Sequence, residues 1–277
     1  MSGQLVPGAF RASKNFPKTT YRAALDYALT ENVLAYGSVS RGFKSGTFNL
    51  LRPGDAPVKP EVLDDYEVGL KNEFLDRKVR LNVDGFFYNY KDIQLERIIN
   101  GPFVTVNAAA AHIYGAEAEL DTAVTSHFTI QGGFSYLHGR YTSFPNAPIS
   151  SPNPAGGNNS VDGDATGNVT IHTPKFKTNI GGTYKMDTLI GQLELAANYS
   201  WTSRYYWDPD NRISQAPYSI VNSSLGWTSA DSRFGVKLWV RNALNEHYAT
   251  CATTAANGDT YAPAPPATYG ITFNVRL

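Results

Sequence analysis

The stretch Tyr269-Gly-Ile-Thr-Phe-Asn-Val-Arg-Leu277 decides the fold of this chain. Its odd-numbered residues are apolar or aromatic, and its even-numbered residues are small, polar or cationic. Successive side chains of a strand point to opposite faces, so the pattern indicates a strand with one apolar and one polar face. A strand that crosses a bilayer needs roughly 9–11 residues, about the length of this stretch. We therefore expect lipid on one face, a wet interior on the other, and repeats of the pattern along the chain.

The composition narrows the class of protein. The 277 residues include 24 basic and 24 acidic side chains, so there is no net charge to favour nucleic acid, and no nucleic-acid partner is expected. Aromatic residues make up 13% of the chain and 24 residues are glycine, a mixture that suits strands and turns. No apolar run approaches the ~18 residues of a membrane helix, which excludes a helical membrane protein. The single cysteine, Cys251, cannot form an internal disulfide.

Alternation of apolar and polar residues recurs along the chain and predicts about eleven strands. Residues 1–20 lack this periodicity and are predicted to be a loop or extension, whereas 21–277 form one domain. The register becomes irregular near Asn89, which suggests a bulge there. The predicted strands cover residues 21–29, 33–43, 65–74, 79–87, 116–121, 128–136, 176–184, 193–201, 221–227, 234–240 and 269–277.

The connections between these strands alternate in length. Short ones lie near 30–32, 75–77, 122–126, 187–190 and 230–232, and long ones near 45–63, 98–108, 145–173, 208–216 and 245–267. Up-and-down membrane barrels have short turns on the periplasmic side and long loops outside, which produces this alternation, whereas a Greek-key sandwich has no reason to show it. The sequence therefore predicts an all-β, antiparallel, up-and-down transmembrane barrel.

Charged residues lie on the polar faces of the predicted strands. A Lys or Arg that faces lipid at mid-depth costs about 2–4 kcal/mol, so these side chains are expected to point inward or lie near an interface. Alternation alone fits a soluble sandwich equally well, and the loop lengths decide for the barrel. The predicted inward residues are Asp65, Glu67, Lys71, Glu117, Glu119, Asp121, Lys175, Lys177, Arg233, Lys237 and Arg241.

Two short motifs resemble metal sites but lack ligands. Asp162, Asp164, Thr166 and Gly167 match the start of a calcium loop, yet Thr173 stands where that loop needs a bidentate Glu. His247 and Cys251 lie four residues apart, and two ligands do not make a zinc site. No Ser/His/Asp, Cys/His or paired-carboxylate arrangement is evident. We expect no metal, no cofactor, no catalytic residue and no enzyme activity.

Aromatic and cationic residues cluster where a strand enters the 208–216 loop. Arg204, Tyr205, Tyr206 and Trp207, followed by Arg212, form a group able to stack on and hydrogen-bond an anionic, aromatic ligand at the outer mouth. The alternative is an interfacial belt, in which Tyr and Trp bridge apolar and wet surroundings. Both readings stay open.

With these strands placed, the chain resembles the C-terminal half of the barrel of TonB-dependent outer-membrane receptors of the siderophore-receptor type. The similarity runs from about Lys18 to Leu277, and its motifs are more specific together than singly. The matching stretches are Tyr36-Gly-Ser-Val-Ser-Arg-Gly-Phe-Lys-Ser-Gly46, Asp65-Tyr-Glu-Val-Gly-Leu-Lys71, Phe86-Phe-Tyr-Asn-Tyr-Lys-Asp-Ile-Gln94, Val106-Asn-Ala108, Ile113-Tyr-Gly-Ala-Glu117, Val240-Arg-Asn-Ala-Leu-Asn245 and Pro266-Ala-Thr-Tyr-Gly270.

The resemblance implies a 22-stranded barrel in the outer membrane of a Gram-negative bacterium, filled by an N-terminal plug. It also implies TonB-energised uptake of a scarce nutrient, most often a ferric siderophore, with loops 45–63, 145–173 and 245–267 facing the ligand. The expected partners are outer-membrane lipid, the plug, the remaining strands and, through the plug, the TonB complex.

The plug, its TonB-contact segment and about half of that barrel are missing from this sequence. We therefore expect a fragment or partial reading frame, folded as an open, curved sheet, because eleven strands leave two unpaired edges. A passive diffusion porin and a soluble β-sandwich adhesin or lectin are the alternatives.

Overall fold

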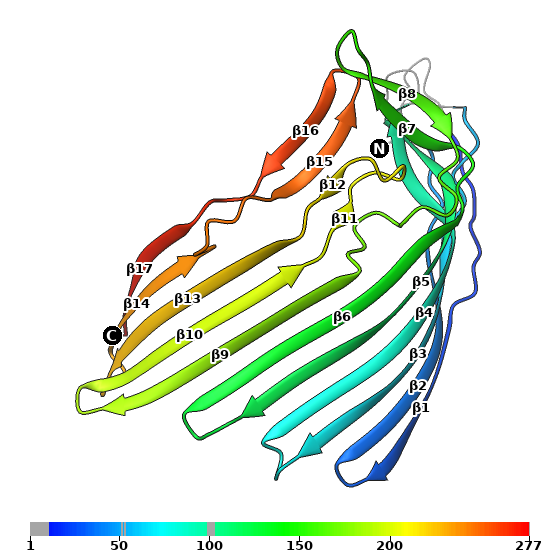
Figure 1. The fold of residues 1–277 in the computed structure, drawn as a ribbon. Helices are drawn as coiled ribbons and strands as arrows, with labels where there is room; N and C mark the ends of the chain where they lie inside the picture. The colour runs from blue at the N-terminus through cyan, green and yellow to red at the C-terminus, as the bar shows by residue number, and fades with distance from the viewer. Residues whose placement is uncertain (1–10, 51, 53, 99–102, 277) are drawn as a thin grey trace, which may run out of the picture.

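The fold is one large antiparallel sheet with three small hairpins (Figure 1). The computed structural model describes all residues except 1–10, 51, 53, 99–102 and 277. Eleven strands follow each other in chain order across the sheet. None of the described residues forms a helix long and apolar enough to cross a membrane. The strands are β1 (Tyr21–Thr30), β2 (Val33–Lys44), β3 (Glu61–Phe74), β4 (Val79–Ile98), β5 (Phe103–Ala123), β6 (Phe128–Ser143), β9 (Phe176–Thr188), β10 (Gly191–Thr202), β13 (Tyr218–Ser229), β14 (Phe234–Arg241) and β17 (Thr268–Val275).

Short turns join the strands at one end of the sheet, and at the other end four of the five predicted long connections are present, between β2 and β3, β6 and β9, β10 and β13, and β14 and β17 (Figure 1). Three of the long segments carry hairpins that the sequence did not predict. These are β7 (Ala147–Pro152) with β8 (Asn158–Gly163), β11 (Tyr205–Tyr206) with β12 (Ser214–Gln215), and β15 (Ala249–Ala255) with β16 (Gly258–Pro263). The end that carries the hairpins is called the outer end below.

The loop predicted over 98–108 is wrong for residues 103–108, because β5 already begins at Phe103 and β4 continues to Ile98; the centre of that loop, 99–102, lies outside the described residues. Residues such as Leu95 and Val106 pair across the ladder, so the two strands extend well beyond their neighbours. The bulge expected near Asn89 is confirmed at a register shift between Tyr90 and Ile93. It restores pairing after a locally left-handed residue, Asp92, which has φ of 54°.

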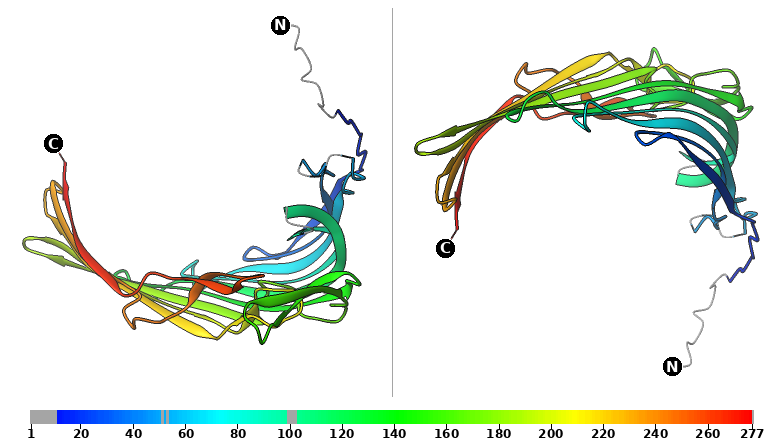
Figure 2. Two further views of the ribbon diagram at one scale, coloured as in Figure 1. Left: turned by 90° about the horizontal axis from the view of Figure 1, so that it is seen from above. Right: turned by 90° about the horizontal axis from the view of Figure 1, so that it is seen from below.

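The sheet curves into an open trough with β1 and β17 at its two edges (Figure 2). This confirms the predicted open, antiparallel arrangement. Apolar side chains cover the convex face and are splayed apart and exposed, among them Ile180 at 52% and Phe273 at 72%. Phe234 and Leu238 are likewise exposed. The apolar side chains of the strands thus point away from the trough, as they must if this face meets lipid.

Two rows of aromatic side chains border the convex face. In barrels the strands tilt by about 35–45°, so residues at one depth shift along successive strands. The two rows show this shift. From β3 to β10, the aromatic residue on a later strand lies closer to the short turns than the residue that pairs directly with the aromatic residue of an earlier strand. On β3, β6 and β9 the two rows are eight residues apart, about 26 Å along a strand at ~3.3 Å per residue. The outer row contains Tyr66, Phe87, Tyr114, Tyr136, Phe176 and Trp201, and the inner row Phe74, Phe128, Tyr184, Trp227 and Phe234.

A small hydrophobic core lies at the outer end, where the 144–173 segment folds back on the sheet. Phe144, fully buried, packs on Tyr141 with ring centroids 5.1 Å apart, and Ile93, Ala109 and Ala111 complete the contact. This core holds the outer segments over the mouth of the trough.

Candidate functional site

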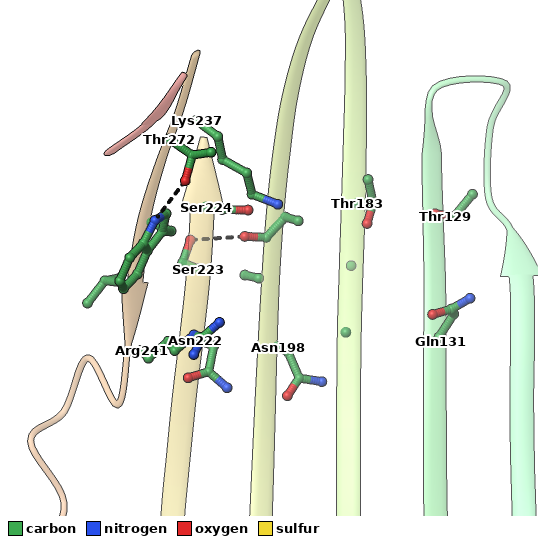
Figure 3. A pocket seen from close by; sticks show the side chains of 16 residues that line it. Thr129, Gln131, Thr183, Asn198, Asn222, Ser223, Ser224, Lys237, Arg241 and Thr272 are labelled. Carbon is green, nitrogen blue, oxygen red and sulfur yellow. Dashed lines mark hydrogen bonds between the residues drawn. The ribbon is translucent and has the colours of Figure 1, made fainter. Parts of the chain in front are cut away.

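Polar side chains line the concave face of the trough (Figure 3). Ladder pairing places Gln131, Asn198 and Asn222 in one row, and Thr129, Thr183 and Ser224 in the next. Lys237 and Thr272 pair directly and continue this wall toward β17. The alternation that makes the convex face apolar therefore makes the concave face a hydrogen-bonding surface.

The charges of the concave face differ between its two halves. On β3 to β5, Glu67, Asp84, Glu117 and Glu119 lie on neighbouring positions, and Glu67 accepts a 2.7 Å hydrogen bond from the Tyr36 hydroxyl. On β9 to β14 the same face carries Lys185, paired at 3.5 Å with Glu194, and the cations of Lys237 and Arg241. The concave face thus has an acidic wall on one side and a more cationic wall on the other.

Aromatic rings gather at the outer end of the concave face. Trp207 meets the His172 ring edge-on at 4.8 Å and the Tyr205 ring at 5.2 Å. Tyr218 lies opposite Thr202 on the concave side and stacks on Tyr248 at 4.5 Å, nearly parallel. Burial raises the pKa of Tyr205 to about 12, so the hydroxyl stays protonated as a hydrogen-bond donor. The group draws on three separate outer segments.

Arg212 ties two outer segments together. Its guanidinium donates to both carboxylate oxygens of Asp259 at 2.8 and 2.7 Å, and Asn158 donates to the same carboxylate at 2.9 Å. The Arg212 hydrogen bonds hold the pKa of Asp259 below its usual range. Bidentate Arg–carboxylate pairs are geometrically specific, so this contact fixes the β15–β16 hairpin against the 203–217 segment.

Asp208 and Asp210 lie beside Arg212 and complete what we call the loop hub, formed by Asp208, Asp210, Asn211, Arg212 and Asp259. Asp210 accepts from the Ser150 amide at 2.9 Å, and Asn211 exchanges two hydrogen bonds with the backbone of Val169, both at 2.9 Å. Asp208 is 9% exposed and accepts from the Ile213 amide. Burial, followed by the neighbouring Asp210 carboxyl, raises the pKa of Asp208 to about 7.

The structure brings only two of the five predicted mouth residues, Tyr205 and Trp207, into ring contact with each other. Tyr205 and Trp207 belong to the aromatic cluster, and Arg204 is exposed with one 3.2 Å hydrogen bond to the Ser214 hydroxyl. The Tyr206 carbonyl accepts from the His172 amide at 2.9 Å, and the charge of Arg212 is engaged by Asp259. Sequence reasoning missed Tyr218, Tyr248 and Asp259. The alternation of β13 could have placed Tyr218 on the concave face, on the same side as Asn222, whereas the other two residues come from a segment distant in sequence.

The motifs that resembled metal sites make ordinary loop contacts. Asp164 accepts from the Thr166 amide at 2.8 Å, and the Thr166 hydroxyl accepts from the Phe144 amide. Cys251 is exposed on β15. Among the residues that the structure describes, no three His, Cys, Asp or Glu side chains lie together in a metal-binding arrangement.

The loop hub is expected to loosen as pH rises from about 4 to about 7, and to show no further loosening well above 7. The pKa of Asp208 is about 7 in the folded hub and 3.8 ordinarily, so the closed hub holds a proton that the open loop releases, and closure weakens with rising pH across that interval. Hydrogen exchange of the hub amides in the intact protein, corrected for intrinsic rates, should show opening increase by up to about tenfold per pH unit. In Asp208→Asn this slope should vanish; an unchanged slope would contradict the assignment.

These features together define a class of protein. An up-and-down antiparallel sheet, an apolar convex band between two aromatic rows, a polar concave wall and long segments at one end are the features of an outer-membrane barrel. The chain supplies one arc of such a wall. It belongs to the family described as TonB dependent receptor-like, beta-barrel, whose model matches residues 2–243. The protein is therefore of the Gram-negative outer membrane, in a family of transport receptors rather than enzymes.

Curated relatives and solved structures agree with this assignment. The chain is 25% identical over 231 residues to the pesticin receptor of Yersinia pestis, covering 81% of this chain and 31% of that protein. It is 23% identical to the probable TonB-dependent siderophore receptor PiuA of Acinetobacter baumannii, covering 88% and 32%. The fold matches the ferric yersiniabactin uptake receptor FyuA from Yersinia pestis with a TM-score of 0.76 and 22% identity, covering 92% of this chain and 36% of FyuA. The chain thus spans about a third of the length of these proteins.

Proposed function

We propose that this chain is part of the barrel wall of a receptor that takes up a ferric siderophore through the outer membrane with energy from TonB. The observation that carries the proposal is the pairing of a polar trough with an aromatic and cationic mouth above it. Relatives named as siderophore receptors support the class of ligand. The remaining strands and a plug seated in the trough are the partners within the receptor, and the TonB complex acts through that plug.

The mouth provides the chemistry that such a ligand needs. Tyr205 and Trp207 offer aromatic faces, and the exposed Arg204 offers a cation for an anionic complex. Tyr206 lies in the same two-residue strand, β11. Arg212 acts indirectly, since its pair with Asp259 holds the segment that presents the other four.

Uptake of iron-55-labelled ferric siderophores by cells that carry the intact receptor tests the proposal. We expect loss of uptake on deletion of the gene and on dissipation of the proton gradient, because TonB energises the step. Tyr205→Ala with Trp207→Ala should raise the ligand Kd about tenfold or more. Tyr199→Ala, on the lipid-facing side of β10, is the matched control and should leave the Kd unchanged. Uptake that persists without a proton gradient would instead indicate a passive porin.

A further inference from the structure

A hollow of about 530 Å³ lies in the concave wall, across β6, β9, β10, β13, β14 and β17 (Figure 3). Pockets that hold compact ligands measure about 300–1,000 Å³, so the hollow has the size of a binding site. It lies within the membrane-spanning part of the wall, because Lys237 is three residues from Phe234 of the inner aromatic row. Ser224, which also lines it, is six residues along β13 from Tyr218 of the mouth, ~20 Å at ~3.3 Å per residue. The hollow is therefore separate from the aromatic mouth.

Two cations of the hollow have no carboxylate partner in the wall. Lys237 and Arg241 are exposed on the concave face of β14, four residues apart, or ~13 Å along the strand. Within the part of the chain that the structure describes, neither of them forms an ion pair. Glu194 stands two strands from Lys237, across Gly226, and its carboxylate is paired with Lys185 at 3.5 Å. The positive charge of the hollow is therefore not compensated by its surroundings.

Trp239 fixes the position of one of these cations. Its indole Nε1 donates to the Thr272 hydroxyl at 3.3 Å, and its ring covers Gly270, where it leaves no room for a Cβ. The guanidinium of Arg241 lies over the same ring, 5.3 Å from its centroid. Because the ring is held by the neighbouring strand, it holds Arg241 at the wall of the trough. A cation that is already ordered loses little side-chain freedom when it binds an anion.

Side-chain amides stand beside the two cations (Figure 3). Asn222 is next to Arg241, and its Oδ1 accepts from the Asn242 amide at 3.0 Å, which fixes that side chain. Asn198 pairs with Asn222 across the ladder, and Gln131 continues the row on β6. Amides both donate and accept, so this row can hydrogen-bond oxygen atoms of many kinds. The hollow thus combines fixed positive charge with neutral hydrogen-bonding groups, opposite the acidic wall of β3 to β5.

We propose that Lys237 and Arg241, with the amides of Gln131, Asn198 and Asn222, form a lumen site that binds an anionic ferric chelate on its way to the periplasm. This inference rests on the proposed function. A chelate built from phenolate, catecholate or carboxylate oxygens carries negative charge, so the two cations attract it and the amides hydrogen-bond its oxygens. The acidic wall opposite repels the same chelate, and the two walls together guide it along β9 to β14. The lumen site therefore serves passage through the barrel rather than capture at the mouth.

Separate measurements of capture and passage test the lumen site in cells that carry the intact receptor. Binding of iron-55-labelled ferric siderophore without a proton gradient gives the Kd at the mouth, and energised uptake gives the maximal rate. We expect Lys237→Gln with Arg241→Gln to lower the maximal rate about fivefold or more and to leave the Kd within about twofold. Lys237→Arg with Arg241→Lys keeps both charges and should keep most of the rate. A role in folding alone would lower the number of binding sites on the cell surface instead, and that result would overturn the proposal.

Arg233→Gln with Arg276→Gln is the charge-matched control. These two residues lie near the short turns and outside the hollow, where the Arg276 amide donates to the Arg233 carbonyl at 2.9 Å. We expect the control to leave both the Kd and the maximal rate unchanged. A loss of rate equal to that of the lumen-site variant would overturn the proposal, because any cation of the inner wall would then serve equally well.

The competing occupant of the hollow is an acidic side chain of the plug. In that case Lys237→Gln with Arg241→Gln would loosen the plug, and cells would admit a large antibiotic such as vancomycin without a proton gradient. That result would overturn the lumen site. An unchanged uptake rate in this variant, in cells whose unchanged receptor transports, would also overturn the lumen site and leave the proposed function standing. An unchanged receptor that shows no energised uptake would instead contradict the proposed function itself.

Discussion

Ile180→Arg is expected to lower the unfolding free energy of the intact receptor by about 2–4 kcal/mol, the cost of an Arg that faces lipid at mid-depth. Ile180 is 52% exposed on the convex face. It lies midway along β9 between Phe176 of the outer aromatic row and Tyr184 of the inner row. No carboxylate stands near it on this face of the ladder, where its partners are Gly132 and Tyr199. Guanidinium unfolding in lipid-containing micelles measures the change.

Two controls separate the lipid environment from side-chain size. Ile180→Phe adds bulk without charge on a face where nothing packs from outside, and should stay within about 0.5 kcal/mol. Asn179→Arg places the same charge one residue away on the polar concave face and should cost much less. If Ile180→Arg and Asn179→Arg cost the same, the convex face does not meet lipid and the assignment of the two faces fails.

The sheet could be predicted from the sequence because strand periodicity and lipid exposure act together. In a soluble protein, apolar residues at every second position indicate only that one face of a strand is buried. Here the pattern seen at Tyr269, Ile271 and Phe273 recurs on successive strands, and the connections between those strands alternate in length. Each prediction depended on local information within a strand and its turn. The facing of most strands followed from those two facts, whereas the open form of the sheet was expected from the two unpaired edges that eleven strands leave.

The outer segments could not be predicted in the same way. The β15–β16 hairpin is held by contacts between residues far apart in sequence, such as Arg212 with Asp259 and Asn158 with Asp259. The Gly and Pro residues of the 145–173 and 245–267 segments signal turns, and they do not show which strands those turns join. Arg212 was predicted as a ligand contact, and only the fold shows that Asp259 engages its charge. Whether the mouth binds a ligand stays a prediction.

Gly115→Ala is expected to destabilise the receptor by about 2–3 kcal/mol, because the concave wall leaves no room for a Cβ at this position. A Cβ on Gly115 would clash with the Tyr136 carbonyl oxygen and stand 2.8 Å from the Phe86 ring. Phe86 pairs directly with Gly115 and lies over it, as Tyr36 lies over Gly69. Aromatic rings that cover strand glycines pin the register of a sheet. Since the Tyr136 atom belongs to the backbone, the strand itself must shift.

Gly85→Ala is the matched control on the neighbouring strand. Gly85 faces the convex side, and a Cβ there would meet only the Gly115 carbonyl oxygen at 3.6 Å, an ordinary contact. Removing a strand glycine also reduces the conformational freedom of the unfolded chain, so this variant should be neutral or more stable by up to about 1 kcal/mol. Equal losses in the two variants would mean that glycine is needed for backbone freedom along this sheet. The expected difference shows instead that glycine is required at 115 for space between the Phe86 ring of β4 and the Tyr136 backbone of β6.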